Sequence, residues 1–244
     1  MTTTESTFDA NSEATSRGSE RESRLDAVFD ALASPACRVV LARLATADDA
    51  LDVADLAEEL DELGERRDEL AARQDEEFDS TDPARATLAR LHHTYLPKLD
   101  DVGLVAYDAD REVVDSTPSA ESGELRAAVE DVAAADLPVE LDALFELLSN
   151  ARRRHAFRTL LAHEEASLAD LADDVAVAER NRRLSRIDPD DVLEVYLSLY
   201  HTHVPKLTGI GVARYDQELD LVALTDEGRR LESVVQELYE AVDA

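Results

Sequence analysis

The sequence predicts a mainly α-helical fold with small β-hairpins (α+β), arranged as two tandem domains. The first observation is an internal repeat: HHTYLPKLDDVGLVAYD (92–108) and YHTHVPKLTGIGVARYD (200–216) match at eight of seventeen positions. The second is the helical spacing of apolar residues through most of each copy. The third is a change to extended patterning after Gly103 and Gly211, where two short apolar runs flank a polar turn.

The repeat covers nearly all of the chain after residue 24. LDAVFDALASPACRVVLARL (25–44) matches LDALFELLSNARRRHAFRTL (141–160), and VADLAEEL (53–60) matches LADLADDV (168–175). ESGELRAAVEDV (121–132) matches DEGRRLESVVQEL (226–238). Two copies are too few for a solenoid, so each copy is expected to be an independent domain. We predict a disordered lead over 1–22, a first domain over 23–136 and a second over 137–244.

Each copy is predicted to begin with three helices. Apolar residues recur at helical spacing over 25–32 and 141–148, and Ser34-Pro35 and Ser149-Asn150 mark the start of the second helix. The third helix covers 53–60 or 168–175, with Ser167 as a cap in the second copy. In the first copy an acidic helix (54–77) extends it.

A longer fourth helix in the second copy begins after Asp188-Pro189, and Pro205 would normally end or kink it. Its inward face is predicted to carry Leu193, Leu197, Tyr200, Val204 and Leu207. A second apolar stripe consists of Val192, Val195 and Leu199. A helix that is apolar on two sides is buried on two sides, which fits an internal pseudo-dimer or a homodimer. The hairpin (212–224) and a last helix (227–242) complete the copy.

The chain carries 56 acidic and 25 basic residues, a net charge of −31, and the acids are spread through apolar-periodic segments. Such a surface is expected in a cytoplasm of very high salt, where repulsion is screened within about 3 Å at 1 M. We therefore predict a soluble, cytoplasmic, haloarchaeal protein. The single cysteine, Cys37, has apolar neighbours and is expected to be buried. No run approaches 18 consecutive apolar residues, so no membrane contact is expected.

Two motifs carry a family resemblance. LASPACRVVLARL (32–44) resembles the opening of ArsR-type regulators, and HVPKLTGIGV (203–212) and YLPKLDDVGLV (95–105) resemble the end of their recognition helix. The whole unit is similar to a haloarchaeal family of winged helix-turn-helix domains of unknown function. The resemblance implies two tandem winged-helix domains, a DNA-binding transcription regulator rather than an enzyme, and double-stranded DNA as the partner of the fourth helix.

The second copy is the predicted DNA reader. Residues 139–244 hold 12 basic and 22 acidic residues, a net charge of −10, and the remaining 13 and 34 give −21. The candidate base-reading residues are Ser198, His201 and Thr202, with Lys206 and Arg214 near phosphates. Two arginine clusters add Arg152, Arg153, Arg158, Arg182 and Arg183. Alternatively, the first cluster pairs with Asp142, Glu146 or Asp173, and the second is a solvated loop.

No catalytic residue, cofactor or metal is predicted. His201 and His203 lie two apart on a helix and do not share a face, so histidines here are expected to cap or pack the helix. No glycine-rich phosphate loop or nucleophile motif accompanies the acids. The alternative function is a winged-helix protein–protein interaction module without DNA binding, with the acidic faces and the second apolar stripe as its contact surfaces.

Overall fold

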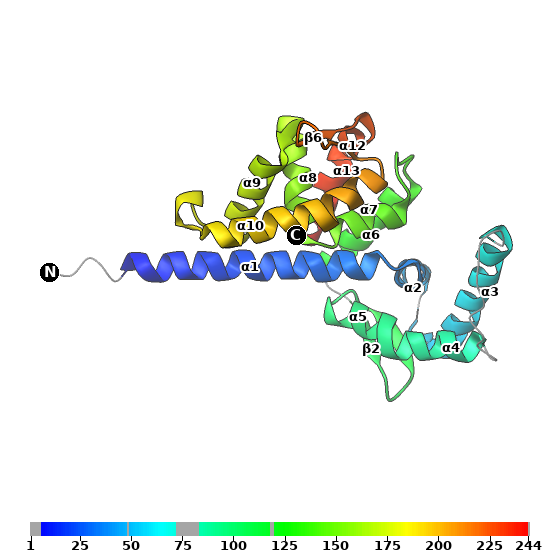
Figure 1. The fold of residues 1–244 in the computed structure, drawn as a ribbon. Coiled ribbons are helices and arrows are strands. Elements are labelled where there is room, and N and C mark those ends of the chain that lie inside the picture. The colour runs from blue at the N-terminus through cyan, green and yellow to red at the C-terminus, as the bar shows by residue number, and fades with distance from the viewer. Residues whose placement is uncertain (1–5, 48, 72–82, 118–119, 244) are drawn as a thin grey trace. The chain divides into compact units, whose positions relative to one another are not determined.

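The computed structural model describes residues 6–47, 49–71, 83–117 and 120–243, and these are mainly helical with two small antiparallel sheets (Figure 1). The predicted α+β class is therefore confirmed. The chain divides into two compact units. Of the described residues, unit 1 contains 6–33 and 132–242, and unit 2 contains 34–131. None of the described helices is long and apolar enough to cross a membrane.

Unit 2 holds the first copy of the repeat from its second helix onward. Its elements are α2 (Pro35–Thr46), β1 (Leu51–Asp52), α3 (Val53–Ala71), α4 (Pro83–Arg90), the π-helix η1 (Leu91–Tyr95), α5 (Leu96–Asp101), β2 (Val105–Asp108), β3 (Val113–Ser116) and most of α6 (Ala120–Ala134). Ser34 and Pro35 begin α2 as predicted, and Cys37 is buried. Residues 72–77 of the predicted acidic helix lie outside the described residues.

Unit 1 holds the second copy together with the N-terminal helix. Its elements are α1 (Ser6–Leu32), α7 (Leu141–Leu148), α8 (Ala151–His163), β4 (Glu165–Ser167), α9 (Leu168–Arg180), the 3-10 helix η2 (Leu184–Arg186), α10 (Pro189–Ser198), the π-helix η3 (Leu199–His203), α11 (Val204–Gly209), β5 (Ala213–Asp216), β6 (Leu221–Leu224), α12 (Asp226–Arg230) and α13 (Glu232–Asp243). From the second helix of the repeat onward, both units share the order helix, short strand, helix, long helix with a π turn, hairpin and C-terminal helix, which in unit 1 is divided into α12 and α13.

Both sheets have three strands, one more than the predicted hairpin. In unit 1 the order is β4-β6-β5, and in unit 2 it is β1-β3-β2. The hairpin register pairs Ala213 with Leu224, and β4 adds to its free edge by pairing Glu165 with Ala223. The added strands are two or three residues long, too short to show an alternating pattern in the sequence.

Capping residues and two glycines set the local geometry. Asn150, Ser167 and Asp188 cap α8, α9 and α10 by accepting hydrogen bonds from backbone N–H groups, as predicted. Gly103 and Gly211 occupy equivalent positions in the repeat and have φ angles of 75° and 83°. Because side chains disfavour this left-handed region, both copies need glycine where the helix turns into the hairpin.

The units differ from the predicted domains at the N-terminus. The predicted first domain includes residues 23–33, but α1 packs against α7 and α8 of the second copy. Its buried residues are Leu25, Val28, Phe29, Ala31 and Leu32. The ring of Phe29 lies edge-on to that of Tyr239 in α13, with centroids 6.0 Å apart. The apolar face of α1 therefore completes the core of unit 1.

The stretch predicted as a disordered lead overlaps α1. Residues 6–22 form the first part of α1, and residues 1–5 lie outside the described residues. Glu22 is held by Arg154, with 2.5 Å between the carboxylate Oε2 and the guanidinium Nη2. The polar composition of this stretch suggests disorder, but the stretch continues a helix that tertiary contacts fix at its C-terminal end.

Candidate nucleic-acid interface

The helix predicted to read DNA runs without a break through α10, η3 and α11 (Figure 1). In η3 the Val204 N–H donates to the carbonyl of Leu199, five residues back rather than four. Pro205 has no N–H, and in a regular α-helix its ring clashes with the carbonyl four residues earlier. The wider π turn lets the helix continue past this proline. The same turn occurs in unit 2, where Leu96 donates to Leu91.

The helix turns a different face to the core from the one predicted. Val204 and Leu207 are buried as expected, but up to the start of η3 the buried positions are Val195 and Leu199, from the predicted second stripe. Three residues predicted to face inward are instead exposed: Leu193 (53 %), Leu197 (45 %) and Tyr200 (38 %). The extra residue in the π turn shifts the helical register, so one straight stripe cannot describe both sides of it.

The outward face carries two of the three predicted base-reading residues. His201 and Thr202 are exposed, whereas Ser198 is half-buried. Leu197 precedes His201 by four residues, so the two side chains are neighbours on the helix surface. The ring of Tyr200 lies edge-on to that of His201, with centroids 4.8 Å apart. A surface with both polar and apolar groups therefore faces solvent here.

The hairpin is fastened to this helix through tyrosines. The Tyr215 hydroxyl donates to Oδ1 of Asp220 at 2.7 Å, and Tyr196 of α10 forms a second hydrogen bond to the same carboxylate. The hydrogen bond to Asp220 is the main reason that the pKa of Tyr215 is raised. The Tyr200 ring lies edge-on to Tyr215 at 6.2 Å. These contacts hold the β5–β6 hairpin beside the middle of the helix.

Exposed arginines lie in the segment before the long helix and on the hairpin beside it. Arg182 and Arg183, together with Arg186, occupy the segment that leads into α10, and Arg214 projects from β5. None of these four forms an ion pair within the described part of the chain. Arg186 is not among the residues predicted from the sequence, although it belongs to the same RNRRLSR cluster (180–186).

The structure does not bring the arginines of α8 to this surface. Arg152 donates to Glu179 at 2.6 Å and to Glu194 at 3.4 Å, which ties α8 to α9 and α10. Arg153 is only 6 % exposed, and its guanidinium donates to the carbonyl groups of Glu146 and Leu147. The predicted phosphate contacts of Arg152 and Arg153 are therefore replaced by internal ones. Both arginines thus have internal partners, but Arg152 pairs with carboxylates other than those expected and Arg153 donates to backbone carbonyls.

Arg158 is exposed but lies on a different side of α8. Its charge acts on His155 of the same helix and on Tyr239 of α13, where it opposes the rise in pKa that burial causes. Arg152, by contrast, contacts α9 and α10. Arg158 is thus separated from the helix that carries His201.

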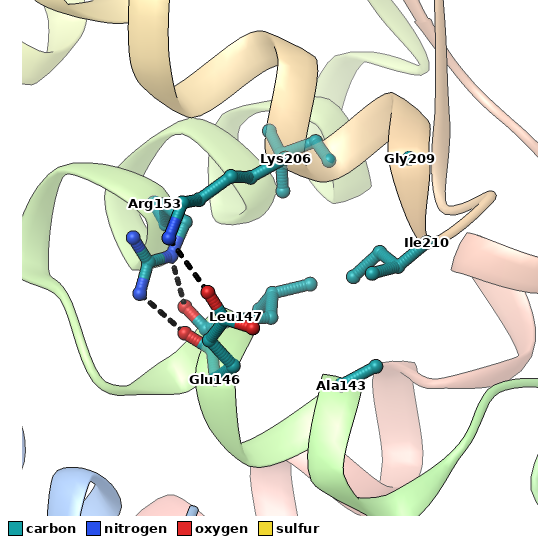
Figure 2. A pocket seen from close by; sticks show the side chains of 8 residues that line it. Ala143, Glu146, Leu147, Arg153, Lys206, Gly209 and Ile210 are labelled. Carbon is teal, nitrogen blue, oxygen red and sulfur yellow. Dashed lines mark hydrogen bonds and ion pairs between the residues drawn. The ribbon is translucent and has the colours of Figure 1, made fainter. Parts of the chain in front are cut away.

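Lys206 lies at the rim of a small pocket between α7 and α11, shown in Figure 2. Its Nζ donates to Oε1 of Glu146 at 2.6 Å, and this hydrogen bond is the main cause of the lowered pKa of Glu146. The pocket has a volume of about 200 Å³. Its lining is mainly apolar: Ala143, Leu147, Leu207, Gly209 and Ile210, with Glu146, Arg153 and Lys206. Lys206 is predicted near a phosphate and instead joins α11 to α7.

His203 is the buried member of the histidine group. It is 6 % exposed, and its Nδ1 has no hydrogen-bond partner within the described residues. Burial, and secondarily the charges of Arg153, Arg152 and Lys206, lowers its pKa to about 4. The imidazole is therefore neutral at physiological pH, which agrees with the predicted packing role. Among the described residues, no three His, Cys, Asp or Glu side chains converge in a metal-binding group.

The equivalent surface in unit 2 shares some of these features. Arg90, His93 and Thr94 are exposed, and Arg111 is exposed in the hairpin turn. His92 replaces Tyr200 in the repeat, and its Nδ1 lies 2.5 Å from the Tyr107 hydroxyl. The contact between the helix and the hairpin is therefore kept in both copies with different side chains.

Carboxylates border the helix in unit 1. Asp190 and Glu194 are exposed on α10, and Asp216 and Glu218 are exposed at the hairpin turn. Asp191 is paired with Arg180 at 3.0 Å, and Glu194 is paired with Arg152. The surface around His201 is thus an uncharged strip. Carboxylates and exposed arginines border it, and of these carboxylates Asp191 and Glu194 are paired with arginines.

The comparisons with known proteins agree with the duplication. The model of a family described as a domain of unknown function (DUF7344) matches the chain twice, over residues 29–115 and 145–223. No similarity to a curated protein or to a solved structure was found. The two matches cover more than half of the chain and coincide with the two copies of the repeat. The chain therefore belongs to the DUF7344 family and carries two tandem copies of its domain.

Proposed function

We propose that this protein is a DNA-binding transcription regulator in which unit 1 reads the DNA. The observation that carries the proposal is the exposed pair His201 and Thr202 on a long helix, with exposed arginines in the segment before it and on the hairpin beside it. Side chains on an exposed helix reach base edges in the major groove, and arginines outside the groove bind phosphates. Arg182, Arg183 and Arg214 are the candidates for the phosphate contacts.

The arrangement of elements supports a winged-helix reading of each copy. Two helices follow the edge strand β4 in unit 1, the second of them the long helix, and an antiparallel hairpin comes after it. In such domains the last helix enters the major groove and the hairpin lies along the backbone. Together with the ArsR-like motifs in the sequence, this order leads us to propose two winged-helix domains.

The charge of −31 is compatible with this function if the protein works in a haloarchaeal cytoplasm. At molar salt the release of counterions contributes little to DNA affinity for any protein, because that term weakens with the logarithm of salt concentration. Repulsion between the protein's carboxylates and the phosphates is screened within about 3 Å at 1 M. Contacts with base edges must then supply most of the affinity.

A protein–protein interaction module is the second candidate function. The exposed Asp190, Glu194 and Glu218 favour it, because carboxylates beside a DNA-reading helix oppose phosphate binding. In this case the helix and hairpin of unit 1 would contact another protein, and no DNA fragment would be selected.

The test is selection of genomic DNA fragments by the purified chain in 2 M KCl, compared with random duplex of the same length. We expect specific fragments to be enriched, and His201→Ala and Thr202→Ala to reduce the enrichment strongly. His163→Ala is the matched control, since His163 is an exposed histidine at the end of α8, away from the helix. If the wild-type chain enriches no fragment over random DNA, the regulator proposal is wrong and the interaction module takes its place.

A further inference from the structure

We propose that unit 1 selects its DNA through the 5-methyl groups of thymine, which contact an apolar stripe formed by Leu193, Leu197 and Tyr200. The inference rests on the proposed DNA-binding function and adds the chemical class of sequence that is read. The three side chains are 53 %, 45 % and 38 % exposed and share the outward side of the helix with His201.

The fold itself does not require large apolar side chains at the positions of Leu193 and Leu197, whereas Tyr200 also contacts Tyr215 of the hairpin. The repeat places Arg85, Ala89 and His92 of unit 2 at the sites of Leu193, Leu197 and Tyr200, and the same helix forms there. The core of unit 1 is filled by other residues of the helix, including Val195 and Leu199. Large apolar side chains that lie in water without a structural need are typical of a binding surface.

Arginines before the helix and on the hairpin favour an anionic occupant, and they lie among exposed carboxylates that include Asp190, Asp216 and Glu218. Arg182, Arg183 and Arg186 precede the helix, Arg214 lies on the adjacent hairpin, and the four make no ion pair among the residues that the structure describes. Two of the neighbouring carboxylates, Asp191 and Glu194, are already paired with arginines of unit 1. An apolar stripe with arginines at both ends, unpaired within the described residues, fits a groove that is lined by phosphates and holds apolar groups.

Thymine is the base that offers such a group, because its methyl projects into the major groove and is contacted by apolar side chains. Leu197 adjoins His201, so one turn of the helix combines a methyl contact with a hydrogen-bonding imidazole. High salt weakens phosphate contacts, whereas it does not weaken the burial of apolar groups. A thymine-reading stripe therefore suits a protein with this acidic composition.

The experiment uses DNA fragments selected by the full chain. Each fragment is synthesised in two forms, one with thymine and one with deoxyuridine in place of thymine. Deoxyuridine has the same hydrogen-bonding groups and lacks only the methyl. The affinity of the wild type in 2 M KCl should fall about fourfold when one contacted methyl group is removed, and about tenfold or more when two are removed. Leu197→Ala should bind thymine DNA more weakly and should show a smaller ratio between the two DNAs.

The matched control is Leu219→Ala, which removes an exposed leucine from the hairpin turn outside the stripe. It should keep the wild-type ratio. Equal affinity of the wild type for thymine and deoxyuridine DNA would overturn the inference while leaving DNA binding intact. Failure to select any fragment would instead overturn the proposed function. If Leu197→Ala keeps the wild-type ratio between thymine and deoxyuridine DNA, the stripe does not read thymine.

Discussion

Arg154 and Asp26 lie 128 residues apart in the chain and form an ion pair, with 2.5 Å between Nη1 and Oδ1. Arg154 is 2 % exposed, and it also donates to the carbonyl of Leu148 at 2.7 Å and to the carboxylate of Glu22. The pair joins α1 to α8 inside unit 1. The first helix of the chain is therefore part of the unit that contains the second copy of the repeat.

The first prediction concerns this buried cation. The double variant Glu22→Gln/Asp26→Asn leaves the Arg154 guanidinium buried without an opposite charge, which should lower the free energy of unfolding by about 3–5 kcal/mol. The measurement is denaturant unfolding in 2 M KCl, followed by circular dichroism. Glu227→Gln/Glu237→Gln removes the same number of charges from exposed positions of α12 and α13 and should change stability by less than about 0.5 kcal/mol. Equal effects of the two double variants would show that Arg154 does not anchor α1.

The second prediction concerns two glycines at equivalent positions of the repeat. A Cβ on Gly228 would lie 2.3 Å from the carbonyl oxygen of Val212 and 2.8 Å from Leu224 Cδ1. Gly228→Ala should therefore destabilise the protein by about 1–3 kcal/mol, because backbone atoms must move. A Cβ on Gly123 would meet nothing within 4 Å, and Gly123→Ala should stabilise α6 by about 0.5–1 kcal/mol. Thermal unfolding of both variants compares the signs, and two shifts in the same direction would contradict the prediction.

The third prediction is a pH dependence caused by His203. Its pKa is about 4 in the folded protein and 6.5 when the imidazole is exposed to water, so between these values the unfolded chain binds a proton that the folded chain does not. The stabilisation is complete above pH 6.5 and is lost as the pH falls toward 4, by about 3 kcal/mol in total. His203→Gln should remove this component from the unfolding free energy measured across that range.

The control for His203→Gln is His201→Gln, which changes an exposed imidazole two residues away. That variant should follow the pH dependence of the wild type. Parallel curves for His203→Gln and the wild type would mean that the burial of His203 does not exclude its proton.

The fourth prediction separates the two groups of arginines. Arg182→Gln/Arg183→Gln should reduce the slope of log affinity against log salt by about 1.8 for a selected DNA fragment, because each phosphate contact contributes about 0.9. Titrations between 0.3 and 1 M KCl measure the slope. Arg158→Gln, on another side of α8, should leave it unchanged. An unchanged slope in the double variant would exclude these arginines from phosphate binding.

The duplication made much of the fold predictable. Helix starts at Ser34, Asn150, Ser167 and Asp188 depend on residues next to one another in the chain, so the sequence was sufficient to locate them. The hairpins were located by the change from helical to alternating spacing, and the repeated turn before them by Gly103 and Gly211. The strands β1 and β4 were missed because they pair with residues far along the chain and are too short to show a period.

The candidate site was predicted in part. His201 and Thr202 are exposed as expected, but Leu197 was expected in the core and is exposed. Arg153 was a candidate either for a phosphate contact or for an internal pairing, and it is buried. The repeated proline at 97 and 205 was the available signal for the π turn, since a proline inside a helix requires a change in hydrogen bonding. A register corrected by one residue for the part of the helix before Val204 would have placed Leu193 and Leu197 outside the core.

The sequence by itself determined the duplication, the α+β class, the order of elements and the acidic surface, because these follow from local spacing, capping residues and charge. Only the tertiary structure decided which repeat receives α1, which face of the long helix is buried and which arginines remain in solvent. Those outcomes depend on contacts between segments far apart in the chain, such as Arg154 with Asp26 and Arg152 with Glu179. Helical periodicity identifies an apolar face, but the packing partner determines whether that face lies in the core or in water.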